Sequence, residues 1–281
     1  MVRLYTENLK IGYGERLIVK NLNAEIPDKK ITTIIGPNGC GKSTLLKAMT
    51  RIISQQAGTV VLDGRDISKE HTKLLAKKMA ILPQSPESAS GLTVAELVSY
   101  GRFPHQQGFG RLSKKDMDVI DWALDVTGTF DYKFLPVDSL SGGQRQRVWI
   151  AMALAQETEI IFLDEPTTYL DMAHQLEVLE LLQKLNLEQG RTIIMVLHDL
   201  NQAARFADYI IAMKDGQVIK AGDCEAVMTH DVLKKVFHID AQIGRDPRTN
   251  KPMCITYNLL RGDKRNEKAA TPIYPAVSVN Y

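Results

Sequence analysis

The stretch from residue 31 to residue 49 places the strongest constraint on the fold of this chain. It begins with β-branched and apolar residues, as expected for a buried strand: Ile31-Thr32-Thr33-Ile34-Ile35. The next residues match the pattern G-x-x-x-x-G-K-[ST] without a departure: Gly36-Pro37-Asn38-Gly39-Cys40-Gly41-Lys42-Ser43-Thr44. Apolar residues continue as a helix: Leu45, Leu46, Ala48 and Met49. Strand, glycine-rich loop and helix in this order predict a loop that cradles phosphate groups.

The residue types in this loop indicate how it would bind a nucleotide. Its backbone N–H groups would hold the β- and γ-phosphates, and Lys42 would reach their oxygens. The Ser43 hydroxyl would bind Mg²⁺. A tight turn with an incidental Lys and Ser is the alternative, and the flanking strand and helix favour the phosphate loop.

A second glycine-rich helix start lies at Leu140-Ser141-Gly142-Gly143-Gln144. Ser141 and Gln144 have the spacing of a capping box. Two glycines follow the cap, although glycine inside a helix costs about 1 kcal/mol relative to alanine. Bare N–H groups at the positive end of a helix dipole favour a phosphate. We therefore expect Ser141, Gly142, Gly143 and Gln144 to face phosphate, at a site separate from the first loop.

Two carboxylates, Asp164 and Glu165, end another apolar strand that begins at Ile160. In α/β sheets the C-terminal ends of buried strands lie beside the phosphate loop. Asp164 is expected to hold Mg²⁺, directly or through water, and Glu165 to polarise the attacking water. An acidic strand-to-turn boundary before Pro166 is the alternative.

Three further candidates are weaker when each is taken alone. Gln84 follows a short strand, and its amide could touch Mg²⁺ or the water. His198 ends an apolar strand and could donate to a γ-phosphate. Tyr13 lies between two glycines and could stack on a base. A solvated glutamine, a structural histidine and a packed tyrosine are the respective alternatives.

Strand and helix patterns predict an α/β fold with a mostly parallel core sheet at residues 1–84 and 158–222. Residues 2–26 alternate as two strands around a glycine turn, which predicts an antiparallel N-terminal β subdomain. Helical patterns at 93–100, 113–126 and 142–156 predict an inserted α-helical subdomain at residues 85–157. Residues 241–260 are expected to form a C-terminal extension. Residues 261–281 are charged and then Pro-containing without periodicity, as in a mobile tail.

Composition narrows the partners and the compartment. Lys plus Arg is 35 against 33 for Asp plus Glu, so charge gives no reason to expect nucleic acid. Three widely spaced cysteines predict neither a zinc site nor a disulfide framework and suggest a reducing compartment. No apolar run approaches the roughly 18 residues of a membrane span, and the N-terminus lacks the apolar region of a signal peptide. We therefore expect a cytoplasmic protein whose membrane role comes through a partner.

Together these residues resemble the nucleotide-binding subunit of ATP-binding cassette (ABC) transporters, over roughly residues 1–240. The matching motifs are the Walker A loop at Gly36 to Thr44, Walker B at Ile160 to Asp164 with the catalytic carboxylate Glu165, the Q-loop at Gln84, the switch histidine at His198, the A-loop aromatic at Tyr13 and the D-loop at Thr168 to Asp171. The resemblance implies a P-loop NTPase core that hydrolyses ATP with Mg²⁺. It also implies a head-to-tail homodimer, in which each ATP lies between the phosphate loop of one subunit and Leu140–Gln144 of the other.

Two segments resemble a narrower group, the ATPases of iron-siderophore, haem and cobalamin importers. They are Tyr100-Gly101-Arg102-Phe103-Pro104-His105 and the run from Thr167 to Gln175, in which Tyr169 replaces the small residue that is commoner in the family. This resemblance implies a peripheral subunit on the cytoplasmic face of the membrane, which contacts a separate permease through about residues 84–106. An extracytoplasmic binding protein would act indirectly, and the cargo would be an iron chelate. Import of haem or cobalamin, a non-transport ABC ATPase and a small-molecule kinase are the alternatives.

Overall fold

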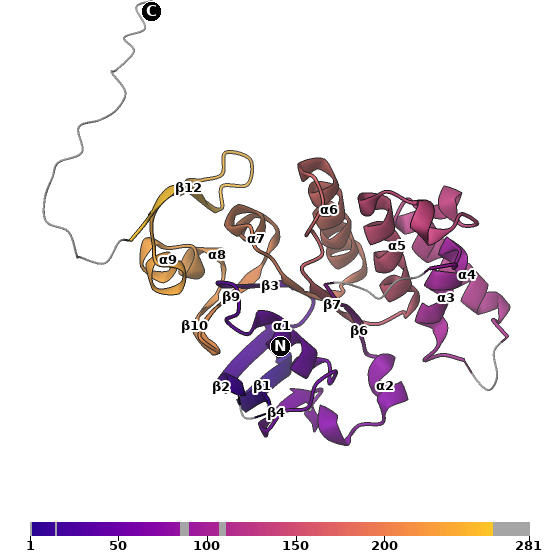
Figure 1. Ribbon diagram of the computed structural model, residues 1–281, viewed down its shortest axis with the longest axis horizontal. Coiled ribbons are helices and arrows are strands. Elements are labelled where there is room, and N and C mark those ends of the chain that lie inside the picture. The colour runs from indigo at the N-terminus through magenta and orange to yellow at the C-terminus, as the bar shows by residue number, and fades with distance from the viewer. Residues whose placement is uncertain (1, 15, 85–89, 107–110, 261–281) are drawn as a thin grey trace, which may run out of the picture.

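The computed structural model describes residues 2–14, 16–84, 90–106 and 111–260. Figure 1 shows a central sheet with an antiparallel sheet below it, α3, α4 and α5 at one end, and α8, α9 and β12 at the other. The predicted fold class is confirmed, with a P-loop α/β core, an antiparallel N-terminal sheet and a helical insertion. The predicted tail at 261–281 lies outside the described residues.

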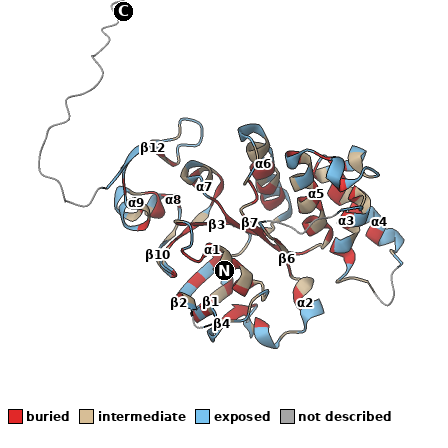
Figure 2. Cartoon of the chain, in the orientation of Figure 1, coloured by how far each residue is buried: buried red, intermediate tan, exposed pale blue. Residues whose placement is uncertain are grey.

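The six-stranded sheet has the order β10-β9-β3-β8-β7-β6. Its strands are β3 (Ile31–Ile35), β6 (Met79–Leu82), β7 (Ile160–Asp164), β8 (Thr192–Val196), β9 (Tyr209–Lys214) and β10 (Gln217–Gly222). All neighbours pair in parallel except β9 and β10, which form an antiparallel edge. Every residue of β3, β7 and β8 is buried, because helices or the second sheet cover both faces, as Figure 2 shows in red.

The antiparallel sheet has the order β2-β1-β4-β5 and covers the helix that follows the phosphate loop. Its strands are β1 (Val2–Tyr13), β2 (Arg16–Pro27), β4 (Ala57–Leu62) and β5 (Arg65–Asp66), and that helix is α1 (Lys42–Met49). Leu45, Leu46 and Met49 of α1 share one buried cluster with Ile11 of β1 and Phe162 of β7. Helix α1 is therefore held between the two sheets.

The helical subdomain contains α3 (Val94–Ser99), α4 (Lys114–Val126) and α5 (Gly142–Ala155). Each begins with a capping box, in which Thr93, Ser113 or Ser141 accepts from the backbone N–H three residues later. These helices differ from their predicted bounds only at the end residues. Short helices that the sequence patterns did not predict complete the first half of the chain: η1 (Ile67–Lys69), α2 (Thr72–Ala76), η2 (Tyr100–Arg102), η3 (Phe130–Tyr132) and η4 (Val137–Ser139).

The C-terminal third adds α6 (Met172–Gln189), α7 (Leu200–Phe206), α8 (Cys224–Val227), α9 (His230–Phe237) and the hairpin β11 (Ile239–Arg245) and β12 (Pro252–Leu259). Helix α6 ends at Gly190, whose φ of 64° is left-handed, a conformation that favours glycine at this position. The boundary predicted at residue 240 falls inside β11. Ile239, Ala241 and Cys254 of the hairpin belong to the same buried cluster as α6 and α7. Among the described residues, no helix is both long enough and apolar enough to cross a bilayer.

A buried arginine joins η2 to the far end of α5. Arg102 is 1% exposed, and its guanidinium donates to Asp116 Oδ1 at 2.8 Å and to Glu157 Oε2 at 2.7 Å. It also donates to the carbonyl oxygen of Ala155, the last residue of α5, at 2.6 Å. Gly101 permits this contact, because a Cβ there would lie 2.2 Å from the carbonyl oxygen of Met152. Arg102 is therefore internal, and it fixes the segment around residue 102 to the C-terminus of α5.

Replacing Arg102 by Ala is expected to lower the free energy of unfolding by about 3–5 kcal/mol, because it leaves the buried carboxylate of Asp116 and the partly buried one of Glu157 without their partner. Urea unfolding measures this loss. Lys133→Ala is the matched control, since it removes a more exposed ion pair with Asp121 and is expected to cost no more than about 1 kcal/mol. Equal losses for the two variants would contradict the structural role of Arg102.

Candidate nucleotide-binding site

The phosphate loop connects β3 to α1 and folds around the Lys42 side chain. Lys42 is 5% exposed, and its Nζ donates to the carbonyl oxygens of Gly36 and Pro37 at 2.9 and 3.1 Å. Gly41, which precedes the helix, has a φ of 104° that favours glycine. A Cβ on Gly36 would lie 2.3 Å from the carbonyl oxygen of Met213. The loop backbone therefore requires these glycines, independently of any ligand.

Cys40 lies within the loop, but its thiol faces the interior. The side chain is 4% exposed, and burial raises the pKa of the thiol. Cys40 is thus a small residue that packs inside the loop. Only its backbone could make the predicted contact with the nucleotide. Asn38 and Gly39, at the tip of the loop, are exposed.

Two of the three predicted Mg²⁺ ligands lie together. The Ser43 hydroxyl donates to Asp164 Oδ1 at 2.8 Å. Asp164 is 2% exposed, and burial raises the pKa of its carboxyl. Within the described part of the chain, no group of three or more His, Cys, Asp or Glu side chains could hold a metal. A hydroxyl and one carboxylate fit Mg²⁺, which is commonly bound by one or two carboxylates together with substrate phosphates and water.

Glu165 is the meeting point of three segments. Its Oε1 lies 2.7 Å from His198 Nε2, and its Oε2 accepts from Gln84 Nε2 at 2.5 Å. Thr168 Oγ1 also donates to Oε2, at 3.1 Å. These residues follow β6, β7 and β8, which are parallel neighbours and so end at one edge of the sheet. The structure thus brings Gln84, Glu165 and His198 together, and places Gln84 on the carboxylate.

The backbone of Glu165 is also unusual, with a φ of 54° in the left-handed region. For a residue other than glycine, this conformation costs about 1–3 kcal/mol and tends to occur at functional sites. The sequence patterns did not assign a role to Thr168. The signal that could have found it is a hydroxyl three residues after the carboxylate, in the turn that follows Pro166.

The start of α5 confirms the capping box predicted at Ser141 and Gln144. The Gln144 N–H donates to Ser141 Oγ at 3.3 Å, and the Ser141 N–H donates to Gln144 Oε1 at 3.0 Å. The side chain of Gln144 is thus engaged within the chain, and it also donates to the Tyr132 hydroxyl at 3.0 Å. Among the described residues, no hydrogen bond or ion pair joins residues 140–144 to the phosphate loop or to Glu165.

The two glycines of this helix start differ. A Cβ on Gly142 would meet nothing within 4 Å, so its N-terminal face is open. A Cβ on Gly143 would lie 2.6 Å from the ring of His174 in α6, so packing alone requires glycine there. The sequence patterns attributed both glycines to phosphate, and the His174 ring gives Gly143 a packing reason in addition. Contacts of Gly142 and Gly143 with phosphate stay predictions.

Tyr13 is 53% exposed at the end of β1. It pairs with Arg16 of β2, and β2 runs past the phosphate loop, since a Cβ on Gly41 would lie 3.3 Å from Val19. The uncovered ring near this loop fits the predicted stacking on a base.

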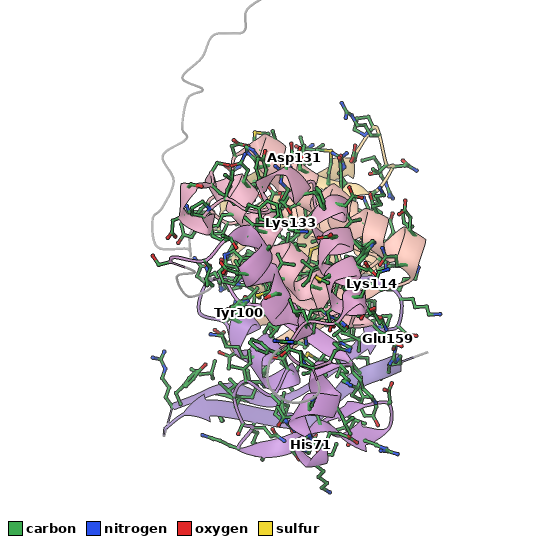
Figure 3. All side chains as sticks on the ribbon, turned by 90° about the vertical axis from the view of Figure 1, so that its right-hand side faces the viewer. His71, Tyr100, Lys114, Asp131, Lys133 and Glu159 are labelled. Carbon is green, nitrogen blue, oxygen red and sulfur yellow. The ribbon has the colours of Figure 1, made fainter. Side chains whose placement is uncertain are left out.

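The predicted permease segment, residues 84–106, is divided between surface and interior. Residues 85–89 lie outside the described residues. Tyr100 and Phe103 are 42% and 59% exposed, and their rings stack with centroids 5.2 Å apart. His105 Nε2 instead lies 2.9 Å from the carbonyl oxygen of Gln156. Figure 3, which views the molecule from the helical end, labels Tyr100 on this surface.

The comparison with protein families matches residues 19–168 to the ABC transporter family. This chain belongs to that family and is an ABC ATPase. Such a cassette binds ATP, forms dimers and acts with membrane permeases.

Among similar proteins is the iron(3+)-hydroxamate import ATP-binding protein FhuC of Bacillus subtilis (strain 168), which is 65% identical over 94% of this chain and 98% of its own. The ferric enterobactin transport ATP-binding protein FepC of Escherichia coli (strain K12) is 44% identical over 91% of this chain and 94% of its own. A putative metal-chelate type ABC transporter solved in an inward-facing conformation superimposes with a TM-score of 0.78 at 29% identity, covering 90% of this chain and 96% of that one. The dimeric ABC transporter cassette MJ0796 has a TM-score of 0.70 at 32% identity, covering 78% of this chain and 98% of that one.

Replacing Gly143 by Ala is expected to lower the free energy of unfolding by about 1–3 kcal/mol, because the new Cβ overlaps the His174 ring. Gly142→Ala is the matched control and is expected to leave this free energy unchanged or slightly raised. Chemical denaturation of both variants measures the difference. The double variant Gly143→Ala/His174→Ala should recover most of the loss, and additive losses would contradict the contact.

Proposed function

We propose that this chain is the ATP-hydrolysing subunit that powers uptake of an iron chelate of the hydroxamate-siderophore type through a separate permease. The 65% identity with the iron(3+)-hydroxamate import protein, which extends over nearly the whole of both chains, carries this proposal. The arrangement of Gln84, Glu165 and His198 at one sheet edge supports the hydrolytic part of it.

In this proposal, separate groups of the chain bind the phosphates, the Mg²⁺ ion and the adenine of ATP. The loop from Gly36 to Thr44 holds the phosphates through backbone N–H groups, and Lys42 exchanges the carbonyl oxygens of its own loop for phosphate oxygens. Ser43 and Asp164 hold Mg²⁺, with Gln84 nearby. The ion, when bound, neutralises charge on the phosphates. Tyr13 stacks on the adenine.

Glu165 is the general base that takes a proton from the attacking water. Its two carboxylate oxygens are engaged by His198, Gln84 and Thr168 in this structure. These three partners use three of the roughly four lone-pair sites of the carboxylate, so they compete with a water for it. His198 and Gln84 gain alternative partners when ATP occupies the site, the γ-phosphate for the imidazole and Mg²⁺ or the water for the amide. ATP would thus free more of the carboxylate for the attacking water.

The second phosphate-facing site requires a partner subunit. Residues 140–144 lie on α5, and Gly142 is open to an incoming group. We propose that two subunits pair head to tail, with each ATP between the phosphate loop of one and Ser141 and Gly142 of the other. Charge-assisted hydrogen bonds to the γ-phosphate contribute roughly 1.5–3 kcal/mol each. Hydrolysis removes these contacts and so permits the dimer to open.

The permease would bind at Tyr100 and Phe103, and α5 would transmit its position. Arg102, between these aromatics, is fixed to the C-terminus of α5, whose N-terminus carries the Ser141 site. A 14-residue helix is about 21 Å long at about 1.5 Å per residue. Movement at the permease contact would therefore displace the phosphate-facing helix end as one rigid body. The subunit would lie at the cytoplasmic face of the membrane and reach the extracytoplasmic binding protein only through the permease.

Glu165→Gln is expected to slow ATP hydrolysis by at least about 100-fold, because the general base is lost. ATP binding should persist, so that the variant accumulates as a dimer with ATP and Mg²⁺ in size-exclusion chromatography. Glu188→Gln, at an exposed position far along α6, should hydrolyse ATP normally and elute as a monomer. A Glu165→Gln protein that stays monomeric at saturating ATP would refute the sandwich dimer.

Deletion of this ATPase is expected to abolish uptake of iron supplied as a ferric hydroxamate. Cells that carry the deletion would be supplied with the wild-type chain or the Glu165→Gln variant, and uptake of labelled iron would be measured. Restoration by the wild-type chain alone supports the proposal. Normal ferric hydroxamate uptake in the deletion, with loss of haem or cobalamin uptake instead, would assign the subunit to the alternative cargo.

A further inference from the structure

Strand β12 presents an apolar stripe that nothing in the described chain covers. Ile255, Tyr257 and Leu259 occupy alternate positions and are 59%, 62% and 74% exposed. We call these three residues the hairpin stripe. Within the described residues, β12 pairs only with β11. Contiguous exposed apolar side chains commonly mark an interaction surface.

The hairpin stripe is continuous with the nucleotide face of the molecule. A hollow of about 660 Å³ lies between β12 and the start of α7, and its lining includes His198, Leu200, Phe237, Ile255 and Tyr257. The switch histidine and two residues of the stripe thus border one depression.

The position of the hairpin against α7 is fixed by a pair of hydrogen bonds. Asn201 Nδ2 donates to the carbonyl oxygen of Cys254 at 3.0 Å, and the Cys254 N–H donates to Asn201 Oδ1 at 2.8 Å. Asn201 lies three residues after His198 in the sequence. Because Asn201 is bonded to the hairpin, His198 and the hairpin stripe form one surface.

The position of the hairpin stripe favours a second copy of this chain over the permease as its partner. The permease contact at Tyr100 and Phe103 lies in the helical subdomain, whereas β12 lies at the opposite end of the molecule (Figure 1). A permease that binds at Tyr100 and Phe103 would therefore not reach the hairpin stripe. In the proposed sandwich dimer, by contrast, the second subunit would cover the face on which His198 lies.

We propose that the hairpin stripe packs against a second copy of this chain and extends the dimer interface beyond the nucleotides. This inference rests on the proposed sandwich dimer, since it uses the face that His198 defines. The contact is apolar and includes no phosphate, so it contributes to dimer affinity without depending on the γ-phosphate.

Photo-crosslinking in the intact transporter identifies the neighbour of the stripe. Tyr257→Cys would be labelled with a maleimide benzophenone. The native thiols Cys40, Cys224 and Cys254 are buried, and burial raises their pKa, so they react slowly. Illumination is expected to give a product that contains two ATPase subunits. Leu187→Cys, an exposed position on α6, is the control and should give none. A product with the permease, a link only within one chain, or no product at Tyr257 would overturn the proposal.

Affinity measurements separate this proposal from the sandwich mechanism. In a Glu165→Gln background with ATP and Mg²⁺, Tyr257→Asp is expected to raise the dimer dissociation constant at least about tenfold. Leu187→Asp should change it less than about twofold. ATP binding to the monomer should be unchanged, because Tyr257 lies outside the proposed nucleotide contacts. Tyr257→Thr, which keeps strand propensity, replaces the Asp variant if that protein folds poorly.

The two proposals fail in different ways. If Glu165→Gln dimerises with ATP and both Tyr257 variants dimerise equally well, the stripe is not an interface and the sandwich stands. If Glu165→Gln never dimerises, the sandwich mechanism fails, and the crosslinked product alone decides what covers the stripe.

Discussion

Parallel pairing of β6, β7 and β8 is the constraint on which the candidate site depends. Because these strands run in the same direction, their C-terminal ends meet at one edge, and the residues that follow them converge there. Gln84, Glu165 and His198 are far apart in the sequence, yet they lie within hydrogen-bond distance. Every residue of β7 and β8 is buried, because both faces of the sheet are covered, so the two strands lie in the core beside the site.

The second constraint lies in the helical subdomain, where Arg102 ties the segment around residue 102 to helix α5. Arg102 is charged and only 1% exposed. A charge can be buried in this way only because Asp116 and Glu157 pair with it. These pairs hold the exposed aromatics Tyr100 and Phe103 against the C-terminal end of α5. One helix therefore joins the surface that we propose for the permease to the helix start that we propose for phosphate. Of the side chains from Tyr100 to His105, Tyr100 and Phe103 are exposed, whereas Arg102 and His105 contact backbone carbonyl oxygens at the end of α5.

Local chemistry made much of the site predictable. The glycine-rich loop, the capping box at Ser141 and Gln144 and the two carboxylates at the end of β7 are each contiguous in sequence, so local patterns could identify them. Non-local contacts were not predictable in the same way. Thr168 contacts Glu165 through a turn whose shape the sequence does not specify, and the need for glycine at residue 143 comes from His174 on another helix. The sequence patterns did not assign the hairpin of β11 and β12, although apolar and polar residues alternate from Ile239 to Ile243 and from Ile255 to Leu259.

The sequence by itself determined the fold class, the family and the identities of the residues proposed to bind phosphate, because strand, loop and helix signals are local and period-specific. Only the tertiary structure decided which of those residues meet. It placed Gln84, His198 and Thr168 on one carboxylate, turned Cys40 and Arg102 inward, and left Gly142 open while covering Gly143. The physical reason is that hydrogen-bond partners and burial depend on distances between segments, which chain order does not specify until the strands have paired.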